Sequence, residues 1–182
     1  MTWANPQVIS PTMPPMRKAV WYIDSVSLSN FAQAHQLDLL LRRYPAGRLC
    51  VTAQVVDELL NGIQAGYKAL KSILPALERG DIGQIQLSVP EFRRYRDLLS
   101  TLGAGEASLI ALAEKRRGTV VTDDRHARSL CRDLHIPVTG TLGILKAACG
   151  ERMLTGVEAD KILADMIRHG FYSPVRKLAE LD

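Results

Sequence analysis

The stretch Ala19-Val-Trp-Tyr-Ile-Asp24 decides the fold expected for this chain. It is a short apolar run that ends in an acid, a pattern typical of a buried strand with Asp24 at its carboxyl end. Similar or alternating runs follow at 48–52, 82–89, 119–123 and 136–139. The segments between them carry apolar residues at helical spacing, so strands alternate with helices. This alternation predicts an α/β fold with three layers, α/β/α, around a mostly parallel central sheet of about five strands.

Residues suited to helix ends divide the segments between the strands. Thr52 is expected to cap the helix after the second strand, and Pro90 to open a later one. Thr155-Gly-Val-Glu158 forms a capping box, and Gly170 is suited to end the helix that begins there. Further helices are expected at about 65–78, 106–116 and 174–181.

The length of 182 residues corresponds to one domain. Residues 1–18 carry four prolines and no hydrophobic period, so we expect a flexible leader there. The main domain is expected over 19–150, followed by a helical extension over 151–182. A stripe in this extension has two interpretations, packing on the chain's own core or forming a surface for a dimer or partner. The stripe consists of Ala159, Ile162, Leu163, Met166 and Ile167.

Composition narrows the class of protein without naming a function. The net charge of +4 and the pI near 9.1 allow a polyanionic partner, although many inert proteins are equally basic. Cys50, Cys131 and Cys149 lack the spacing of a zinc site, and reduced core thiols are expected. No apolar run approaches the roughly 18 residues of a membrane span, and no signal peptide is apparent, so a cytoplasmic location is expected.

Acidic residues fall where an open α/β sheet binds ligands, at the carboxyl ends of its strands. Asp24 ends the first strand, and Asp123 and Asp124 end the strand at 119–123. Glu58 and Glu106 lie on helices that follow loops or strands. Each acid has an ordinary alternative as a turn former, helix cap or surface residue. Their joint occurrence at distant points that can meet at one edge favours a functional site.

Four motifs, in order, resemble those of the PIN-domain family. Tyr22-Ile-Asp-Ser25 is similar to the family's opening motif, and Val51 to Leu59 resembles the strand and helix that carry its second acid. Gly105 to Ala113 is similar to a third motif in the subfamily of toxin ribonucleases (VapC-like) that has Glu in place of Asp. Val121-Thr-Asp-Asp-Arg-His-Ala-Arg128 resembles the fourth motif. The resemblance covers about 130 residues, from Ala19 to Ala148.

The resemblance implies a PIN-like fold and a metal-dependent ribonuclease with catalytic acids Asp24, Glu58, Glu106 and Asp124. Of these, Asp24, Glu106 and Asp124 are expected to hold one or two Mg²⁺ or Mn²⁺ ions. Magnesium binds through one or two protein carboxylates and several waters, which suits such a cluster. Because Glu106 is one methylene longer than Asp, the number of ions stays open. The resemblance aligns Asp124, rather than Asp123, with the family's fourth acid.

Neighbouring residues are expected to support this site. We expect Ser25, Thr122 and Asp123 to orient the ligands or their bound water, with helix capping as the alternative for Ser25. Arg125 and Arg128 are expected to contact RNA, although a solvated helix surface has the same pattern. A second basic cluster, Arg93 to Arg96 with Tyr95, has the same two interpretations.

The resemblance also implies partners, and the sequence excludes other enzyme classes. VapC-like toxins are paired with a small antitoxin protein, so we expect such a partner and RNA as substrate, but no membrane. A homodimer stays open as a further assembly. The chain lacks a GxxxxGK[ST] phosphate loop and has Asp24-Ser-Val26 where haloacid-dehalogenase-like enzymes show Asp-x-Asp. Two alternatives stay open: a PIN-like module that mainly binds RNA or a partner, and another metal-dependent phosphohydrolase on a similar sheet.

Overall fold

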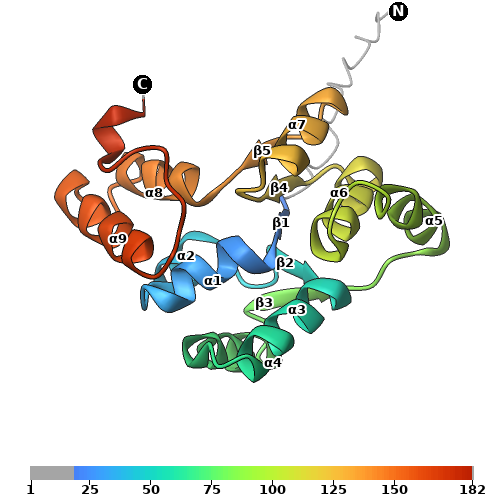
Figure 1. The fold of residues 1–182 in the computed structure, drawn as a ribbon, viewed down its shortest axis with the longest axis horizontal. Helices are drawn as coiled ribbons and strands as arrows, with labels where there is room; N and C mark the ends of the chain where they lie inside the picture. Colours follow the sequence, from blue (N-terminus) through green and yellow to red (C-terminus); the bar gives the residue numbers. More distant parts are fainter. Residues whose placement is uncertain (1–18, 182) are drawn as a thin grey trace, which may run out of the picture.

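A computed structural model of the protein describes residues 19–181, so the leader expected over 1–18 lies outside the described residues. The described chain contains a five-stranded sheet in the order β3-β2-β1-β4-β5, flanked by helices (Figure 1). The strands are β1 (Trp21–Ile23), β2 (Leu49–Thr52), β3 (Ile82–Ile85), β4 (Thr119–Val121) and β5 (Val138–Thr139). Every adjacent pair is parallel. The predicted three-layer α/β fold is confirmed.

The helices occupy the segments between these strands and after them. Those before β4 are α1 (Ser25–Gln33), α2 (Leu37–Arg43), α3 (Ala53–Gln64), the 3₁₀ helix η1 (Lys68–Ile73), α4 (Leu74–Glu78), α5 (Val89–Leu98) and α6 (Ala104–Arg116). Those after it are α7 (Arg125–Asp133), α8 (Thr141–Gly150), α9 (Gly156–Arg168) and the 3₁₀ helix η2 (Leu178–Glu180). No helix within residues 19–181 is long and apolar enough to cross a membrane.

The strand order reverses at the centre of the sheet, between β1 and β4. The chain runs from β1 outward through β2 to β3, then returns across the sheet to place β4 on the other side of β1. Trp21, Tyr22 and Ile23 pair in register with Thr119, Val120 and Val121. Ligands of open α/β sheets bind beyond the carboxyl ends of the strands at such a reversal. Asp24 and the residues after Val121 therefore emerge side by side at this position.

Helix α6 is the central helix of the fold. It contacts β1, β2, β4, α3, α5 and α7, and the residues from Ala107 to Ala113 are all buried. Its small residues let it lie close to several elements at once. Ser108 satisfies its hydroxyl by donating to the Gly105 carbonyl and by sharing a 2.6 Å hydrogen bond with Thr52. The first turn of α6, which carries Glu106, is thereby tied to the end of β2.

Several boundaries differ from the sequence prediction. The strand expected over 82–89 ends at Ile85, because the capping box of Ser88 and Glu91 starts α5 at Val89. The helix expected at 106–116 begins at Ala104, so Gly105 lies within its first turn. The segment at 65–78 splits into η1 and α4, with Pro75 in the first turn of α4.

The prediction of a helix over 174–181 was also wrong, since only residues 178–180 are helical and form a 3₁₀ turn. The Ser173 hydroxyl instead bonds with the backbone of Val175, which favours a local turn over a helix cap.

Helix α9 packs against the body of the same chain. It contacts α8, α1 and η2. Of its apolar stripe, Ala159, Ile162, Leu163 and Met166 are buried, and Ile167 is half-buried. Thr155 and Glu158 form the predicted capping box, and Gly170 follows the helix with φ of +100°. Between the two interpretations of this stripe, the structure places its side chains against the chain's own core.

An ion pair of Glu91 and Arg116 joins α5 to the last residue of α6, away from the edge of the sheet where Asp24 lies. Glu91 is 3 % exposed and accepts from Arg116 Nε at 2.5 Å and Nη2 at 2.7 Å. The hydrogen bonds from Arg116, followed by those from Ser88, outweigh the effect of burial and lower the pKa of Glu91 to about 2. The charged carboxylate is therefore favoured in the folded state.

This ion pair predicts a defined contribution to acid stability. A carboxyl whose folded pKa is depressed stabilises the protein above its unfolded pKa, near 4.5, and loses this contribution as the pH falls towards 2. We expect Glu91→Gln to lower the free energy of unfolding by about 2 kcal/mol at pH 7, after allowance for the partly exposed Arg116. Thermal melts from pH 7 to pH 2 check this. A constant difference between the two proteins over the whole range would contradict the assigned pKa.

Candidate active site

Asp24 occupies the first position after β1 and caps α1. Its backbone N–H donates to the Val121 carbonyl of β4 at 3.0 Å, and its Oδ1 accepts from the Ser27 N–H at 2.6 Å. The residue is 1 % exposed, and its Oδ2 has no hydrogen-bond partner within residues 19–181. A buried carboxylate oxygen without a partner carries a desolvation cost of the kind that ligand binding relieves.

The environment of Asp24 disfavours its charge. Burial, the largest effect, and the nearby charge of Asp123 both raise the pKa of Asp24, which lies at about 7. Thr122 and Ser27 lower it in part. The Thr122 hydroxyl lies near enough to have this effect, but it does not satisfy Oδ2. Asp24 is thus a carboxyl whose charged form needs a positive ligand at neutral pH.

The neighbours Asp123 and Asp124 have different surroundings. Asp123 accepts hydrogen bonds from the Thr141 N–H and hydroxyl, from Ser27 at 3.2 Å and from Asn30 at 3.4 Å. It therefore ties β4 to α1 and α8. Asp124 is exposed, and its Oδ1 caps α7 by accepting from the Ala127 N–H at 2.7 Å.

Gly140 makes room for the Asp123 carboxylate. A Cβ at this position would lie 2.9 Å from the Thr122 carbonyl oxygen and would also clash with Asp123 Oδ1. The chain before α8 can therefore approach Asp123 closely only with glycine at 140.

Glu58 is held in place by residues from two other elements. The Ser25 hydroxyl donates to its Oε2 at 2.6 Å, and the Gly105 N–H donates to its Oε1 at 2.8 Å. A Cβ on Gly105 would come within 2.9 Å of Oε1 and closer still to Oε2. Ser25 thus supports Glu58 rather than capping α1, which is capped by Asp24.

Glu106 lies in the first turn of α6 and is half-buried. Burial raises its pKa, its own backbone N–H lowers it, and the nearby charges of Glu58 and Asp124 raise it again. Asp24 is coupled in the same way to Asp123. Glu58 also lies beside Glu106 in the structure, because it accepts from the N–H of Gly105, the residue before Glu106.

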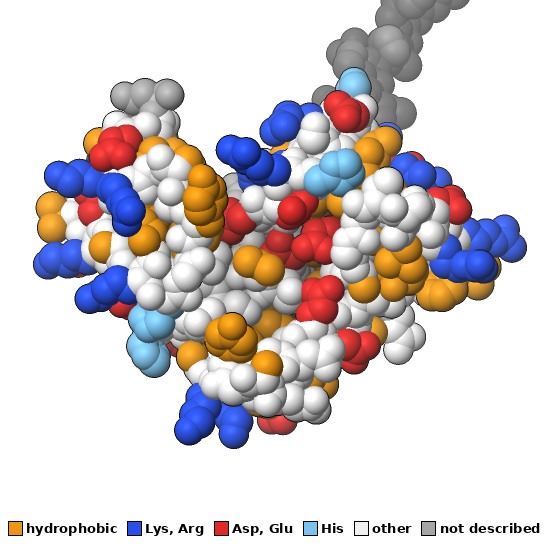
Figure 2. Space-filling view, in the orientation of Figure 1, with side chains coloured by type: hydrophobic (Ala, Val, Ile, Leu, Met, Phe, Trp, Pro, Cys, Tyr) orange, Lys and Arg blue, Asp and Glu red, His pale blue; other side chains and the backbone are white. Residues whose placement is uncertain are grey.

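The predicted acids therefore gather at one edge of the sheet. Figure 2 shows acidic side chains in a hollow between the side of the molecule formed by α8 and α9 and the side formed by α6 and α7. Within residues 19–181 no three His, Cys, Asp or Glu side chains are close enough to bind one ion directly as they stand. Magnesium needs only one or two protein carboxylates, the other positions being filled by water and substrate oxygens.

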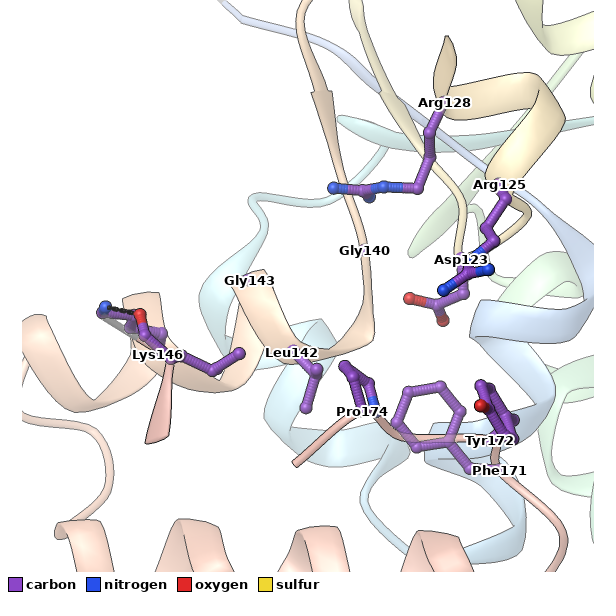
Figure 3. A pocket seen from close by; sticks show the side chains of 11 residues that line it. Asp123, Arg125, Arg128, Gly140, Leu142, Gly143, Lys146, Phe171, Tyr172 and Pro174 are labelled. Carbon is purple, nitrogen blue, oxygen red and sulfur yellow. Dashed lines mark hydrogen bonds between the residues drawn. The ribbon is translucent and has the colours of Figure 1, made fainter. Parts of the chain in front are cut away.

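The predicted basic residues divide between two places. Arg125 and Arg128 line a cavity of about 690 Å³ that Asp123 also borders (Figure 3). The Arg128 Nη1 donates to the Thr122 carbonyl at 2.9 Å. In the second cluster, by contrast, Arg94 is engaged in an ion pair with Glu114 at 2.8 Å.

Sequence reasoning missed four residues at this edge. Ser27, Asn30 and Thr141 bind Asp123, and Tyr172 lines the cavity beside it. Ser27 carried a usable signal, because it stands three residues after an acid that ends a strand and so can close a helix cap. The others lie far from Asp123 in sequence and carry no local signal.

Comparison with known proteins finds one family whose profile matches the chain. The profile of a family described as PIN domain matches residues 20–181. A search of curated proteins gives no match. Among solved structures, the chain is similar to one in the crystal structure of VapBC2 from Rickettsia felis bound to a DNA fragment from their promoter. That similarity has a TM-score of 0.49 and 15 % identity, and covers 66 % of this chain and 98 % of the other.

Proposed function

The chain belongs to the PIN-domain family, and from this membership we propose that it is a metal-dependent endoribonuclease, the toxin of a toxin–antitoxin pair. The observation that carries the proposal is Asp24, a buried carboxyl at the point where the strand order reverses, with one oxygen that has no hydrogen-bond partner among residues 19–181. Support also comes from Glu58, which accepts from Ser25 beside Asp24 and from Gly105 beside Glu106, and from Glu106 and Asp124, whose charges influence each other.

The donor set fits a hard divalent cation. Mg²⁺ and Mn²⁺ prefer carboxylate and water oxygens, and carboxylates are the groups that Asp24, Glu106 and Asp124 present. The unpartnered Oδ2 of Asp24 and the raised pKa values of Asp24 and Glu106 favour a bound cation. We assign Asp24, Glu106 and Asp124 as the residues that hold one or two ions. When bound, the cation activates water and neutralises charge on the phosphodiester.

The chain's own residues position this chemistry. Glu58 is fixed by Ser25 and by the Gly105 N–H, so its carboxylate cannot turn away from Glu106 without breaking both bonds. It is suited to accept a proton from water that attacks the phosphate. The Ser27 N–H holds Oδ1 of Asp24 in place, and Thr122 and Asp123 influence its charge. Arg125 and Arg128 supply positive charge beside an acidic edge that would otherwise repel RNA.

The toxin role rests on the resemblance of the four motifs to those of VapC-like toxins. It implies a small antitoxin partner and action on cytoplasmic RNA. A short open reading frame beside the gene, whose product copurifies with this chain and suppresses RNA cleavage, is the expected finding. If the chain cleaves RNA but its gene has no such neighbouring reading frame, the nuclease proposal stands and the toxin proposal is wrong.

The nuclease proposal is tested by incubating the purified protein with single-stranded and structured RNAs in Mg²⁺, Mn²⁺ or EDTA. Cleavage is expected with either metal and not with EDTA. Cleavage that persists unchanged in EDTA would exclude metal-dependent chemistry. No cleavage of any RNA with either metal would favour the module that only binds RNA or a partner.

The neighbours Asp123 and Asp124 are expected to separate into a structural and a catalytic residue. Asp124→Asn keeps a good helix cap, so its melting temperature should stay near that of the parent while cleavage falls at least about tenfold. Asp123→Asn breaks hydrogen bonds from Thr141, Ser27 or Asn30 and should melt earlier, with the smaller loss of cleavage. Initial cleavage rates and thermal melts of both variants check this. The reverse order of rates would assign the metal to Asp123.

A further inference from the structure

A cavity beside the acidic edge combines cationic and aromatic side chains from separate segments. Arg125 and Arg128 of α7 lie on one side, and the rings of Phe171, Tyr172 and Pro174 lie on the opposite side (Figure 3). Leu142 and Lys146 of α8 form another part of the cavity wall, and Asp123 borders the cavity. The volume of about 690 Å³ lies within the range of roughly 300–1,000 Å³ usual for small-ligand sites.

The three cations at this cavity are not neutralised within the described chain. None of Arg125, Arg128 and Lys146 has a carboxylate within 4.0 Å among residues 19–181. Arg128 donates to the Thr122 carbonyl and Lys146 donates to the Leu181 carbonyl at 2.9 Å, so both are held by neutral acceptors. Their charges and the whole of the Arg125 guanidinium are therefore available to an anion.

Tyr172 is an exposed aromatic ring on an anchored backbone. It is 84 % exposed, whereas its neighbour Phe171 is 8 % exposed. The Phe171 N–H donates to the Met166 carbonyl at 3.0 Å, and the Leu178 N–H donates to Asp160 at 2.8 Å. Both ends of the segment are thus fixed to α9. An aromatic ring held in place this way can stack on a ligand at a small cost in conformational entropy.

We infer that this cavity binds one unpaired nucleotide of a single-stranded RNA, with its base stacked on Tyr172 and its phosphate against Arg125 and Lys146. This inference rests on the proposed function and names its substrate as a strand with an unstacked base. Cationic and aromatic groups together match a nucleotide, since stacking accepts any base while the cations bind the backbone. A paired base keeps its faces stacked inside the helix and is not available to the ring.

The cavity lies next to the acids proposed for catalysis, and this determines where the bound nucleotide lies relative to the cleavage site. Asp123 borders the cavity, and Ser27 joins it to Asp24 by donating its hydroxyl to Asp123 at 3.2 Å and its N–H to Asp24 at 2.6 Å, so the two sites adjoin. The bound nucleotide therefore lies close along the strand to the phosphodiester that is cut. It would help to hold that bond at the acidic edge.

The test measures RNA affinity in the full chain carrying Asp24→Asn, which is expected to slow cleavage enough for a binding measurement. Fluorescence anisotropy gives the Kd of a short labelled single-stranded RNA for this parent and for three further variants, in the presence of Mg²⁺. Tyr172→Ala should weaken binding about tenfold, the range found for loss of one base–aromatic stack. Tyr172→Phe keeps the ring and should bind like the parent. Phe92→Ala removes another exposed ring, on α5, and should also have no effect.

A second readout identifies stacking itself. An abasic nucleotide moved along the RNA should weaken binding to the parent at one position and have no effect there on Tyr172→Ala. Equal Kd values for Tyr172→Ala and the parent would overturn the inference and leave a peptide of a protein partner as the occupant to consider. A parent that binds no RNA would instead overturn the proposed function, so the two failures are distinct.

Discussion

Asp24→Asn is expected to lower the rate of RNA cleavage by roughly 100- to 1,000-fold. The amide lacks the charge with which Asp24 would hold a divalent cation, and the electrostatic part of metal catalysis is worth several kcal/mol, each 1.4 kcal/mol being tenfold in rate. Asparagine is isosteric and caps helices well, so α1 and its bond from the Ser27 N–H should persist. The loss should therefore appear in kcat with little change in RNA affinity.

The matched control is Asp57→Asn, which removes an exposed acid on α3 next to Glu58 in sequence. It should cleave RNA like the parent. Single-turnover rates with saturating protein separate the chemical step from binding. If Asp24→Asn retains a rate within about tenfold of the parent, Asp24 contributes too little to be a metal ligand in the sense proposed.

Divalent metal is expected to stabilise the protein, and Asp24→Asn is expected to be more stable than the parent without metal and to gain less stability from it. Without metal, the buried carboxylate is costly at pH 8, so the variant should melt roughly 2–8 °C higher, for a gain of about 1–2 kcal/mol. With Mn²⁺ at tenfold its Kd, the parent should gain about 1.4 kcal/mol, or roughly 3 °C, because the ion binds only the folded chain. Mg²⁺ should act in the same direction and more weakly at equal concentration.

The raised pKa of Asp24 determines how the stability difference between Asp24→Asn and the parent depends on pH. The pKa of Asp24 is raised to about 7 in the folded protein, above its ordinary value of 3.8. Between these values the folded state binds more protons than the unfolded state, so stability falls as the pH rises through this range. The advantage of Asp24→Asn without metal should therefore be present at pH 8 and nearly absent at pH 4.

Thermal melts of both proteins in EDTA and in Mn²⁺, at the two pH values, check the prediction. Asp57→Asn again serves as the control and should respond to metal like the parent. A parent whose melting temperature does not change with metal would mean that these acids do not form a cation site. The same conclusion follows if Asp24→Asn responds as strongly as the parent.

Local pattern in the sequence was enough to predict the architecture. The apolar run before Asp24 and the alternation of strands with helices predicted a mostly parallel sheet of about five strands. The observed sheet has five strands, and all its adjacent pairs are parallel. Caps such as Thr52 and the Thr155–Glu158 box lie where expected, because a cap depends on residues three positions apart. The four motifs also indicated the family that the profile over residues 20–181 shows.

Tertiary structure decided how the acids are held. Glu58 is bound by Ser25, 33 positions away, and by Gly105, 47 positions away, and Asp123 is bound by Ser27, 96 positions away. Such pairs depend on how helices pack on the sheet, and no periodicity within one segment encodes them. The sequence could therefore nominate Asp123 as a supporting residue but could not reveal that it joins β4 to α1 and α8.

The clearest limit of the sequence lies in the segment after α9. A helix was expected over 174–181, but only residues 178–180 are helical, and this turn packs on α9 and α8. Tyr172, at the start of the segment after α9, lines a cavity that Asp123 also borders. Local propensity favoured a helix because it counts only neighbours, whereas buried Phe171 and Leu178 fix this segment to the body of the molecule. The sequence by itself determined the sheet, the family and the acids at one edge. Only packing between distant segments determined which of these acids are free to bind and which groups lie beside them.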